Sequence, residues 1–343
     1  MLRRLLANLA VVLSTLLVML LLAEFLVPHL VTLRDVGASF TQYDPIVGKR
    51  LKPSFSVVRT SPEFTWRFAT NSLGHRGDEP KGPIDRPILF LGDSFTMGYG
   101  VSNGEEFPAL IGAELRMRHG ERAPYVMNLG IGNIGNGAWI RHLDHTAPPL
   151  NPRLVVMEVL QNDFTDNLSE RLYELDASGK LVELPVPPPS RLRKVQQFIE
   201  QVPWIANSNL LALTRQTVVT TAGAGFGGGQ QPVVAPVNAK DFDELRLMPG
   251  DPLTVKIVET AVRRCQAKGW PVLVLSVGLS QARREAIAQM VKATGAPLLE
   301  LPSQLSRPDL YFTIDGHWNV KGQADTARRV MAAIDELKLL KID

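Results

Sequence analysis

Residues 87–92, ProIleLeuPheLeuGly, form a short apolar run that leads directly into Asp93 and Ser94. Such a run, ended by a glycine, is typical of a strand buried inside a parallel sheet. Open α/β sheets place their chemistry where the strands end, and glycines at 92, 98 and 100 leave the backbone around Ser94 open to a ligand. The segment therefore predicts an α/β fold that presents a serine at the end of a central strand. The alternative is that Ser94 only caps the next helix.

Strand and helix patterns alternate along the rest of the chain, which predicts a parallel sheet with right-handed crossovers. The expected strands are short apolar runs, and the expected helices have one apolar face. The strands are expected at 87–92, 125–130, 154–159, 270–276 and 297–301, and the helices at 105–117, 135–147, 254–268, 281–294 and 320–338. Asn319 is a natural N-cap for the last helix.

Two later segments carry the polar groups that a serine nucleophile requires. Asn162 and Asp163 follow the expected strand 154–159, and AspGlyHis occupies positions 315–317. Serine is a poor nucleophile at neutral pH unless a general base, usually histidine, removes its proton. His317 fits that role. A carboxylate must hold its imidazole in the correct tautomer, and Asp315 is the nearest candidate.

The GlyAspSer, AsnAsp and AspGlyHis blocks, in this order, resemble those of the SGNH hydrolases, also called the GDSL esterase/lipase family. The resemblance covers about residues 85–165 and 255–338 and implies a three-layer α/β/α fold with a parallel, flavodoxin-like sheet. It implies that Ser94 is the nucleophile, His317 the base and Asp315 the residue that orients it. The oxyanion hole would consist of the Ser94 backbone N–H, Gly132 and the side-chain amide of Asn162.

Two departures from the family pattern leave alternatives open. The final block of the family usually reads Asp-x-x-His, whereas only Gly316 separates the pair here, a spacing that also resembles SGNH-like sugar O-acetyltransferases. Asp309 is therefore a second candidate for the orienting carboxylate. In the second block, AsnLeuGlyIleGlyAsnIleGly (128–135), either Gly132 or Asn133 occupies the oxyanion position, and we favour Gly132.

The N-terminus predicts a membrane anchor. Arg3 and Arg4 precede an apolar run from Leu5 to Ala23, about the length that crosses a bilayer as a helix. The positive flank stays in the cytoplasm, so the chain after Glu24 is expected outside it, in the periplasm of a Gram-negative cell. A cleaved signal peptide is the alternative, but residues 21–25 offer no small-x-small cleavage site. Glu24 itself is expected among the lipid headgroups.

The sequence divides into an anchor (1–30), a prelude with short strands (31–84) and an α/β domain (85–343) with an insertion at about 164–253. In the prelude, alternating apolar residues at 65–70 predict a hairpin or an edge strand. In the segment 71–77, Asn71 and Gly74 are expected to form a turn and Arg76 to pair with a surface carboxylate. The alternative is that His75 and Arg76 contact substrate.

The insertion combines a proline run, an amphipathic stretch and a glycine-rich stretch, at 185–190, 191–199 and 222–231. Low-complexity sequence of this kind buries too little apolar surface to fold, so most of the insertion is expected to be a flexible loop. Its helical part, roughly 191–217, could roof the active site or lie against the membrane. Simple packing on the domain is the favoured role of its apolar residues.

Composition excludes several classes of function. The 37 Lys and Arg nearly balance the 34 Asp and Glu, and no basic patch is interleaved with aromatic residues, which argues against nucleic-acid binding. Cys265 is the only cysteine, so it forms no intramolecular disulfide and is expected to pack inside a helix. No motif has metal-ligand spacing, so neither a metal nor a cofactor is expected.

These features together predict a membrane-anchored, extracytoplasmic serine esterase that acts on acyl esters, either O-acetylated envelope glycans or lipids. An O-acyltransferase is one alternative. Another is a non-catalytic scaffold that binds a polysaccharide or an assembly partner, although such a scaffold need not keep Ser94, Asn162, Asp315 and His317 together. Trp139, Trp204 and Trp318 allow stacking on sugars or burial in the core.

Overall fold

The computed structural model describes residues 2–31, 33, 39–189, 202, 205, 208–222 and 246–342. The amphipathic stretch 191–199, Trp204 and nearly all of the glycine-rich stretch lie outside the described residues. The lid proposed for 191–217 therefore concerns mainly residues that are not described.

A five-stranded parallel sheet forms the centre of the molecule. Its order is β11-β10-β7-β5-β6, which is the flavodoxin-like order 2-1-3-4-5 read from the other edge. Every residue of the two central strands β5 and β7 is buried, as their continuous apolar sequences predict. The expected α/β fold is confirmed. The strands are β5 (Ile88–Leu91), β6 (Val126–Asn128), β7 (Leu154–Leu160), β10 (Val272–Val277) and β11 (Leu298–Leu301).

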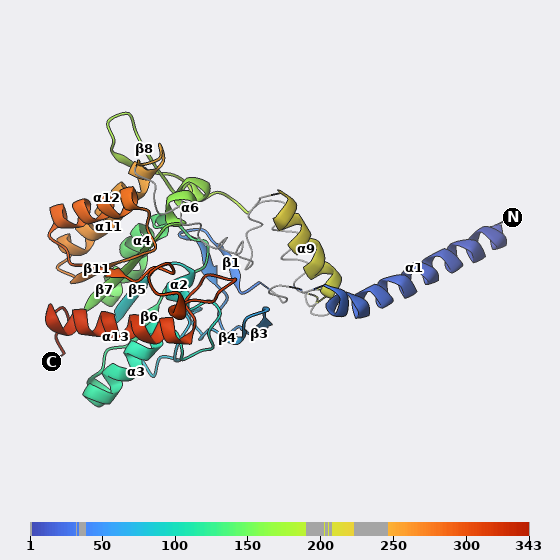
Figure 1. Ribbon diagram of the computed structural model, residues 1–343, viewed down its shortest axis with the longest axis horizontal. Coiled ribbons are helices and arrows are strands. Elements are labelled where there is room, and N and C mark those ends of the chain that lie inside the picture. Colours follow the sequence, from blue (N-terminus) through green and yellow to red (C-terminus); the bar gives the residue numbers. More distant parts are fainter. Residues whose placement is uncertain are drawn as a thin grey trace.

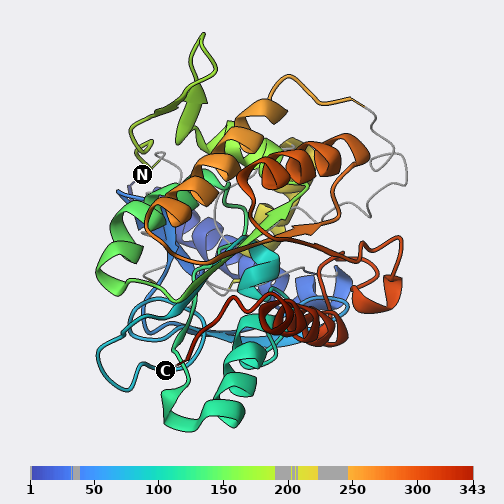
Figure 2. The same cartoon turned by 90° about the vertical axis from the view of Figure 1, so that its left-hand side faces the viewer.

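Helices cover both faces of this sheet (Figures 1 and 2). Leu89 and Leu91 of β5 pack in one buried cluster with residues of α4 (Gly137–Arg141), α11 (Asp251–Ala267) and α12 (Gln281–Thr294). Ile88 and Phe90 point the other way, toward α3 (Phe107–His119) and α13 (Val320–Glu336). Alternate residues of one strand thus build two separate cores, which is the three-layer arrangement. Cys265 is fully buried in α11, as expected, and burial raises the pKa of its thiol to about 12.

The expected helix 135–147 is broken. Its residues form α4, then a π-helical turn over His142–Thr146, then α5 (Ala147–Leu150). Pro148 and Pro149 explain the break, because a proline has no N–H to donate to the preceding turn and its ring crowds the carbonyl four residues earlier. The π-helical turn, which is wider than an α-helical one, accommodates this interruption.

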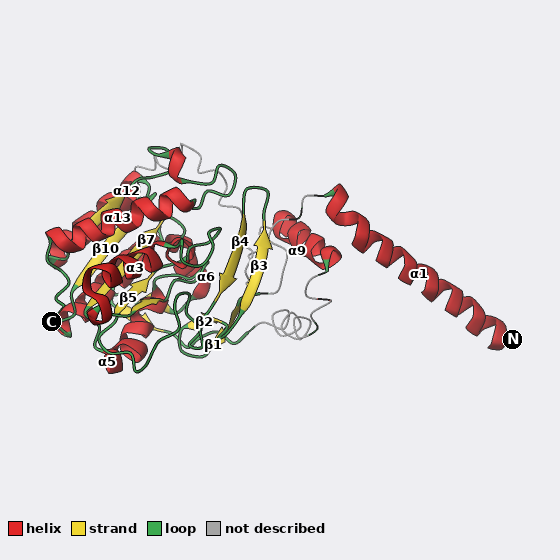
Figure 3. Cartoon of the chain, turned by 90° about the horizontal axis from the view of Figure 1, so that it is seen from below, coloured by secondary structure: helices red, strands yellow, loops and turns green. Residues whose placement is uncertain are grey.

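The described residues of the prelude include two hairpins. Strand β1 (Thr41–Asp44) pairs with β2 (Gly48–Leu51), and β3 (Ser56–Thr60) pairs with β4 (Thr65–Ala69), both antiparallel. The alternation in β4 buries Trp66 and Phe68 in the same core cluster as Leu89, so the predicted strand is confirmed. Figure 3 shows the β3–β4 hairpin beside the α/β layers, on the side of α1 and α9.

Helix α1 (Leu2–Leu30) extends away from the rest of the chain, and nearly all its side chains are exposed (Figure 1). It is long and apolar enough to cross a membrane, and an 18-residue window within it has a mean hydropathy of 2.6. Near its end, the Glu24 carboxylate accepts hydrogen bonds from Ser208 Oγ and from the backbone N–H groups of Asn209 and Leu210. These groups begin α9 (Asn209–Ala222), so Glu24 caps a helix of the insertion.

Other described parts of the insertion follow β7 directly. Helix α6 (Asp163–Glu170) leads to a small antiparallel hairpin of β8 (Tyr173–Leu175) and β9 (Leu181–Glu183). The remaining described helical elements are short turns: α2 (Ser94–Met97), Gly120–Arg122 and Pro308–Leu310.

Candidate active site

The strand order brings two of the sequence blocks together. Ser94 follows β5 and Asn162 follows β7, and these neighbouring strands lie where the direction of strand order reverses. In open α/β sheets, this switch point leaves a crevice at the carboxyl ends of the strands, where ligands bind. Ser94 and Asn162 therefore lie at the same edge of the sheet, at the carboxyl ends of two adjacent strands.

Ser94 is the first residue of α2, directly after a tight turn. The carboxylate of Asp93 caps this short helix by accepting a hydrogen bond of 3.0 Å from the Phe95 N–H. Gly92 makes the turn possible, because a Cβ there would lie 2.1 Å from Thr96 Oγ1. Gly130, from the second block, has the same role on the other side, since its Cβ would lie 2.4 Å from Met97 N. The glycines therefore allow the backbone to close tightly around Ser94.

His317 lies between Ser94 and Asp315. Its Nε2 is 2.8 Å from Ser94 Oγ, and its Nδ1 is 2.5 Å from Asp315 Oδ1. Because a carboxylate only accepts, Nδ1 carries the hydrogen and Nε2 is free to accept the serine proton. Ser94 Oγ also lies 3.2 Å from Asp93 Oδ1, but His317 is the closer acceptor. Ser94 and His317 are 2% and 1% exposed, so the pair is shielded from water.

A tight turn lets Asp315 reach His317 across a single residue. Phe312 N–H donates to the His317 carbonyl at 2.8 Å, and Gly316 N–H donates to the Phe312 carbonyl at 3.1 Å. Gly316 adopts a φ of +83°, in the left-handed region that favours glycine. The turn folds Asp315 back toward the imidazole. The short spacing of the final block is therefore compatible with the pairing of Asp315 and His317.

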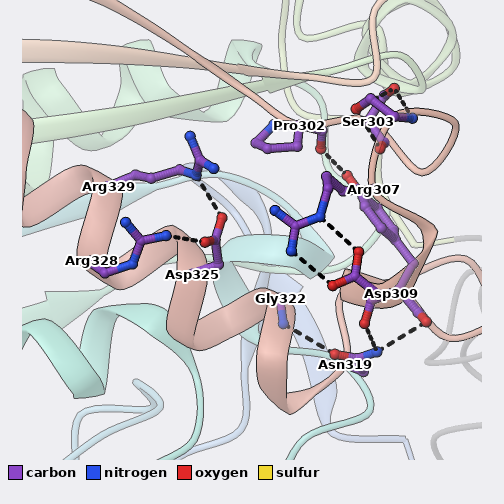
Figure 4. Close-up of polar contacts among 11 residues, drawn as sticks. Pro302, Ser303, Arg307, Asp309, Asn319, Gly322, Asp325, Arg328 and Arg329 are labelled. Carbon is purple, nitrogen blue, oxygen red and sulfur yellow. Dashed lines mark hydrogen bonds and ion pairs between the residues drawn. The ribbon is translucent and has the colours of Figure 1, made fainter.

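Asp309 has a different partner (Figure 4). Its carboxylate accepts two hydrogen bonds from Arg307, of 2.7 and 2.8 Å, and its side chain is 53% exposed. These bonds hold the pKa of Asp309 below its ordinary value. The pairing leaves Asp315 as the carboxylate at His317.

Asn319 fixes the loop that carries His317. Its Oδ1 accepts from Gly322 N–H at 3.1 Å, which confirms the expected N-cap of α13. Its Nδ2 donates to the carbonyls of Asp309 and Tyr311, both at 3.0 Å (Figure 4). One side chain thus joins the start of α13 to the strand-like segment before the turn.

The side-chain amide of Asn162 faces two carboxylates. Its Nδ2 donates to Asp93 Oδ2 at 2.7 Å and to Asp166 Oδ2 at 2.9 Å. An amide nitrogen has two hydrogens, so both are used in this structure. For Asn162 to serve an oxyanion, the reacting oxygen must take the place of one carboxylate. Asp166 is one helical turn beyond Asn162, a spacing that sequence reasoning could have used but did not.

The second-block loop is held by a lysine from the prelude. Lys49 Nζ, on β2, donates to the carbonyls of Gly132 and Asn133 at 2.8 and 2.5 Å. Asn133 has a φ of +53°, so the backbone turns at this residue. Both candidates for the oxyanion position therefore lie on one loop fixed by Lys49, and the choice between them stays a prediction.

Buried carboxyl groups lie beneath the nucleophile. Burial raises the pKa of Asp93 and of Asp163, and hydrogen bonds from Asn162 and Asn136 oppose this rise. Burial, together with the neighbouring charge of Asp93, raises the pKa of Glu158 to about 8. Glu158 accepts a hydrogen bond from the Thr96 hydroxyl.

Several residues singled out in the sequence lie elsewhere. Trp139 and Trp318 are buried in the core and unavailable for stacking on sugars. Asn71 and Gly74 form the expected turn, since Gly74 N–H donates to the Asn71 carbonyl at 3.0 Å. Arg76 differs from expectation: it is fully buried, as is Glu106, whose carboxylate lies 3.6 Å away.

His75 lines a cavity of about 190 Å³ between the prelude and the π-helical turn, and neither Ser94 nor His317 lines it. His142 faces the same cavity, and burial lowers the pKa of both imidazoles to about 4.

Among the residues that the structure describes, no group of three His, Cys, Asp or Glu side chains could hold a metal ion.

A scan against models of known protein families and a search of curated proteins both find no match. Solved structures do resemble the chain. An alpha/beta hydrolase enzyme from the metagenome of Lake Arreo, Spain, is 14% identical, with a TM-score of 0.42 over 73% of this chain and 95% of that one. The acetyl xylan esterase AlAXEase is 12% identical, with a TM-score of 0.43 over 72% and 99% of the two chains.

A GDSL-like lipase from Bacteroides thetaiotaomicron VPI-5482 is 12% identical, with a TM-score of 0.38 over 74% of this chain and 89% of that one. These are likenesses of fold, so the chemistry of the site has to follow from its own geometry.

We expect Asn162→Ala to lower kcat for ester hydrolysis by about a hundredfold or more while changing KM less, because an oxyanion donor serves the transition state rather than the bound substrate. Steady-state kinetics, normalised to the number of sites that a fluorophosphonate titrates, would measure this. Loss of the bond to Asp93 could also loosen the fold, so thermal unfolding serves as the control. A rise in KM at unchanged kcat would assign Asn162 to substrate binding instead.

Proposed function

We propose that the chain is a serine esterase of SGNH type that forms an acyl-enzyme on Ser94. The observation that carries this proposal is the continuous hydrogen-bonded line from Ser94 through His317 to Asp315. A serine that only packs in the core needs neither an imidazole as its hydrogen-bond acceptor nor a carboxylate bonded to the far side of that imidazole. Retention of this line also argues against the alternative of a non-catalytic scaffold.

The first half-reaction breaks the ester. Ser94 Oγ attacks the acyl carbon while its proton passes to His317 Nε2, and Asp315 stabilises the imidazolium that forms. The Ser94 N–H, the Gly132 loop and the Asn162 amide would hold the oxyanion, each donor contributing about 3 kcal/mol to lowering the barrier. The imidazolium then gives its proton to the leaving alcohol oxygen, and the acyl group remains on Ser94.

The second half-reaction releases the acyl group. His317 removes a proton from water, the hydroxide oxygen attacks the acyl carbon, and the proton returns to Ser94 Oγ as the acid leaves. If a sugar hydroxyl takes the place of water, the same residues transfer the acyl group. For the substrate we propose O-acetylated envelope glycans, with lipid esters as the alternative. For the reaction we propose hydrolysis, with acyl transfer as the alternative, and the assay must separate these cases.

The test uses the full-length chain in detergent. We expect a fluorophosphonate probe to label one site, and a panel of acetylated sugars, short acyl esters and lysophospholipids to include a substrate that is hydrolysed. Adding an acceptor sugar separates transfer from hydrolysis, since transfer yields a new ester rather than free acid. A folded chain that neither reacts with the probe nor cleaves any ester would favour the scaffold.

We further propose that α1 anchors the chain in the membrane with its remainder outside the cytoplasm. We expect the protein to stay with the membrane fraction after a high-salt wash, because about twenty apolar residues hold it there. A reporter fused after residue 343 should be active only if it works outside the cytoplasm. The matched control lacks residues 2–30 and should be soluble. A soluble mature form that begins near residue 24 would show a cleaved signal instead.

A further inference from the structure

The prelude contacts three of the loops of the candidate active site: those of Ser94, of the second block and of Asp315. Arg76 donates to the carbonyls of Met97 and Gly98, at the end of the short helix that Ser94 begins, and to that of Val101. Lys49 holds the carbonyls of the second-block loop. Glu63 is the third such residue, and it contacts the loop that carries Asp315.

Glu63 belongs to the turn between β3 and β4, and its place is well defined. Ser61 Oγ accepts hydrogen bonds of 3.2 Å from the N–H groups of Glu63 and Phe64, and Ser61 N–H donates to the Phe64 carbonyl at 2.8 Å. The Phe64 ring packs on Phe312, with 4.5 Å between the ring centroids. The same turn thus supports the triad loop with an aromatic contact at one point and a carboxylate at another.

The carboxylate of Glu63 accepts from two consecutive peptide groups. Its Oε2 lies 2.9 Å from Ile314 N and 2.7 Å from Asp315 N. Hydrogen bonds to an ionised acceptor are the strong ones among those available to a backbone N–H. The neighbouring residue Ile314 is 46% exposed, so packing does little to hold this part of the turn. Glu63 supplies what packing does not.

We propose that Glu63 is a positioning residue of the triad: by holding the N–H groups of Ile314 and Asp315, it keeps the Asp315 carboxylate where it accepts the hydrogen of His317 Nδ1. The inference rests on the proposed function, and it means that the prelude helps to position a catalytic side chain. A final block with only one residue between Asp and His leaves little freedom to correct an error in the turn. Displacement of the turn therefore separates the carboxylate from the imidazole directly.

The experiment compares Glu63→Ala and Glu63→Gln in the full-length protein in detergent. We expect Glu63→Ala to lower kcat per fluorophosphonate-titrated site by about ten- to hundredfold at nearly constant KM, the cost of a displaced catalytic group. Glu63→Gln should recover most of kcat, because its amide carbonyl can accept from the same two N–H groups. In Glu63→Ala the acidic limb of the pH profile of kcat/KM should move to lower pH, since the imidazolium has lost an aligned carboxylate.

The matched control is Glu79→Ala. Glu79 is another carboxylate of the prelude that accepts from a backbone N–H, that of Ser72 at 2.9 Å, but it supports a turn away from the triad. We expect this variant to keep the wild-type kcat and pH profile. If it loses as much kcat as Glu63→Ala, general loosening of the prelude explains both, and the positioning role is wrong.

Two further measurements separate positioning from folding. In an Asp315→Asn background, Glu63→Ala should cost no further activity, because the two changes act through the same contact. Additive losses would overturn the proposal, as would Glu63→Ala with wild-type kcat. The low-field proton resonance expected for His317 Nδ1–H should shift or broaden in Glu63→Ala. This signal needs no turnover, so it tests the position of Asp315 even if the wild type cleaves no ester and the proposed function fails.

Discussion

Ser94→Ala is expected to leave the fold intact and to abolish both ester hydrolysis and fluorophosphonate labelling. The side chain is small and buried at the start of α2, so loss of one hydroxyl creates little space and removes two hydrogen bonds, those with His317 and Asp93. Without Oγ no acyl-enzyme can form. The expected fall in kcat is on the order of a millionfold, the scale measured when a triad nucleophile is removed from a serine protease.

Ser102→Ala is the matched control. Ser102 lies on the loop just beyond α2, and its Oγ accepts a hydrogen bond of 3.2 Å from the Arg67 N–H rather than from any triad residue. This variant should be labelled as fast as the wild type. Undiminished labelling of Ser94→Ala would rule out Ser94 as the nucleophile and, with unchanged hydrolysis, would make the scaffold the better description of this chain.

The α/β core could be predicted from sequence because its signals are local. The run 87–92 is apolar throughout, and each expected strand falls within two residues of an observed one. Ser94, Asn162 and His317 follow from the same logic, since each lies just beyond a strand or just before a helix. The parallel topology then brings the first two to the same edge of the sheet without further information.

The contacts made by the prelude could not be predicted, because they join residues far apart in sequence. Lys49 reaches a loop more than eighty positions away and Glu63 one more than two hundred and fifty positions away. Neither residue lies in a motif, and charged side chains on short strands and turns are ordinarily solvated. Arg76 was expected at the surface for the same reason. Its burial follows from Trp66 and Phe68, whose rings lie 5.4 Å from its guanidinium.

Asp315→Asn is expected to cost on the order of ten-thousandfold in kcat, through loss of the tautomer in which His317 Nδ1 carries the hydrogen. The Asp315 carboxylate is 2.5 Å from that nitrogen and can only accept. An asparagine at this place can turn its NH₂ group toward Nδ1, which forces the hydrogen onto Nε2. Nε2 then no longer accepts the serine proton, and the geometry survives while the chemistry is lost.

Asp309→Asn should change kcat little and stability by less than about 1 kcal/mol, because it removes only an exposed ion pair with Arg307. Kinetics of the two variants, with thermal unfolding as a check on the fold, decide between the two carboxylates. If the losses exchange places, Asp309 orients the imidazole in solution and the turn around Gly316 must rearrange. If neither variant loses activity while His317→Ala does, a backbone carbonyl orients the imidazole and the catalytic group is a Ser94–His317 dyad. If His317→Ala also keeps its activity, His317 is not the general base, and the proposed mechanism is wrong.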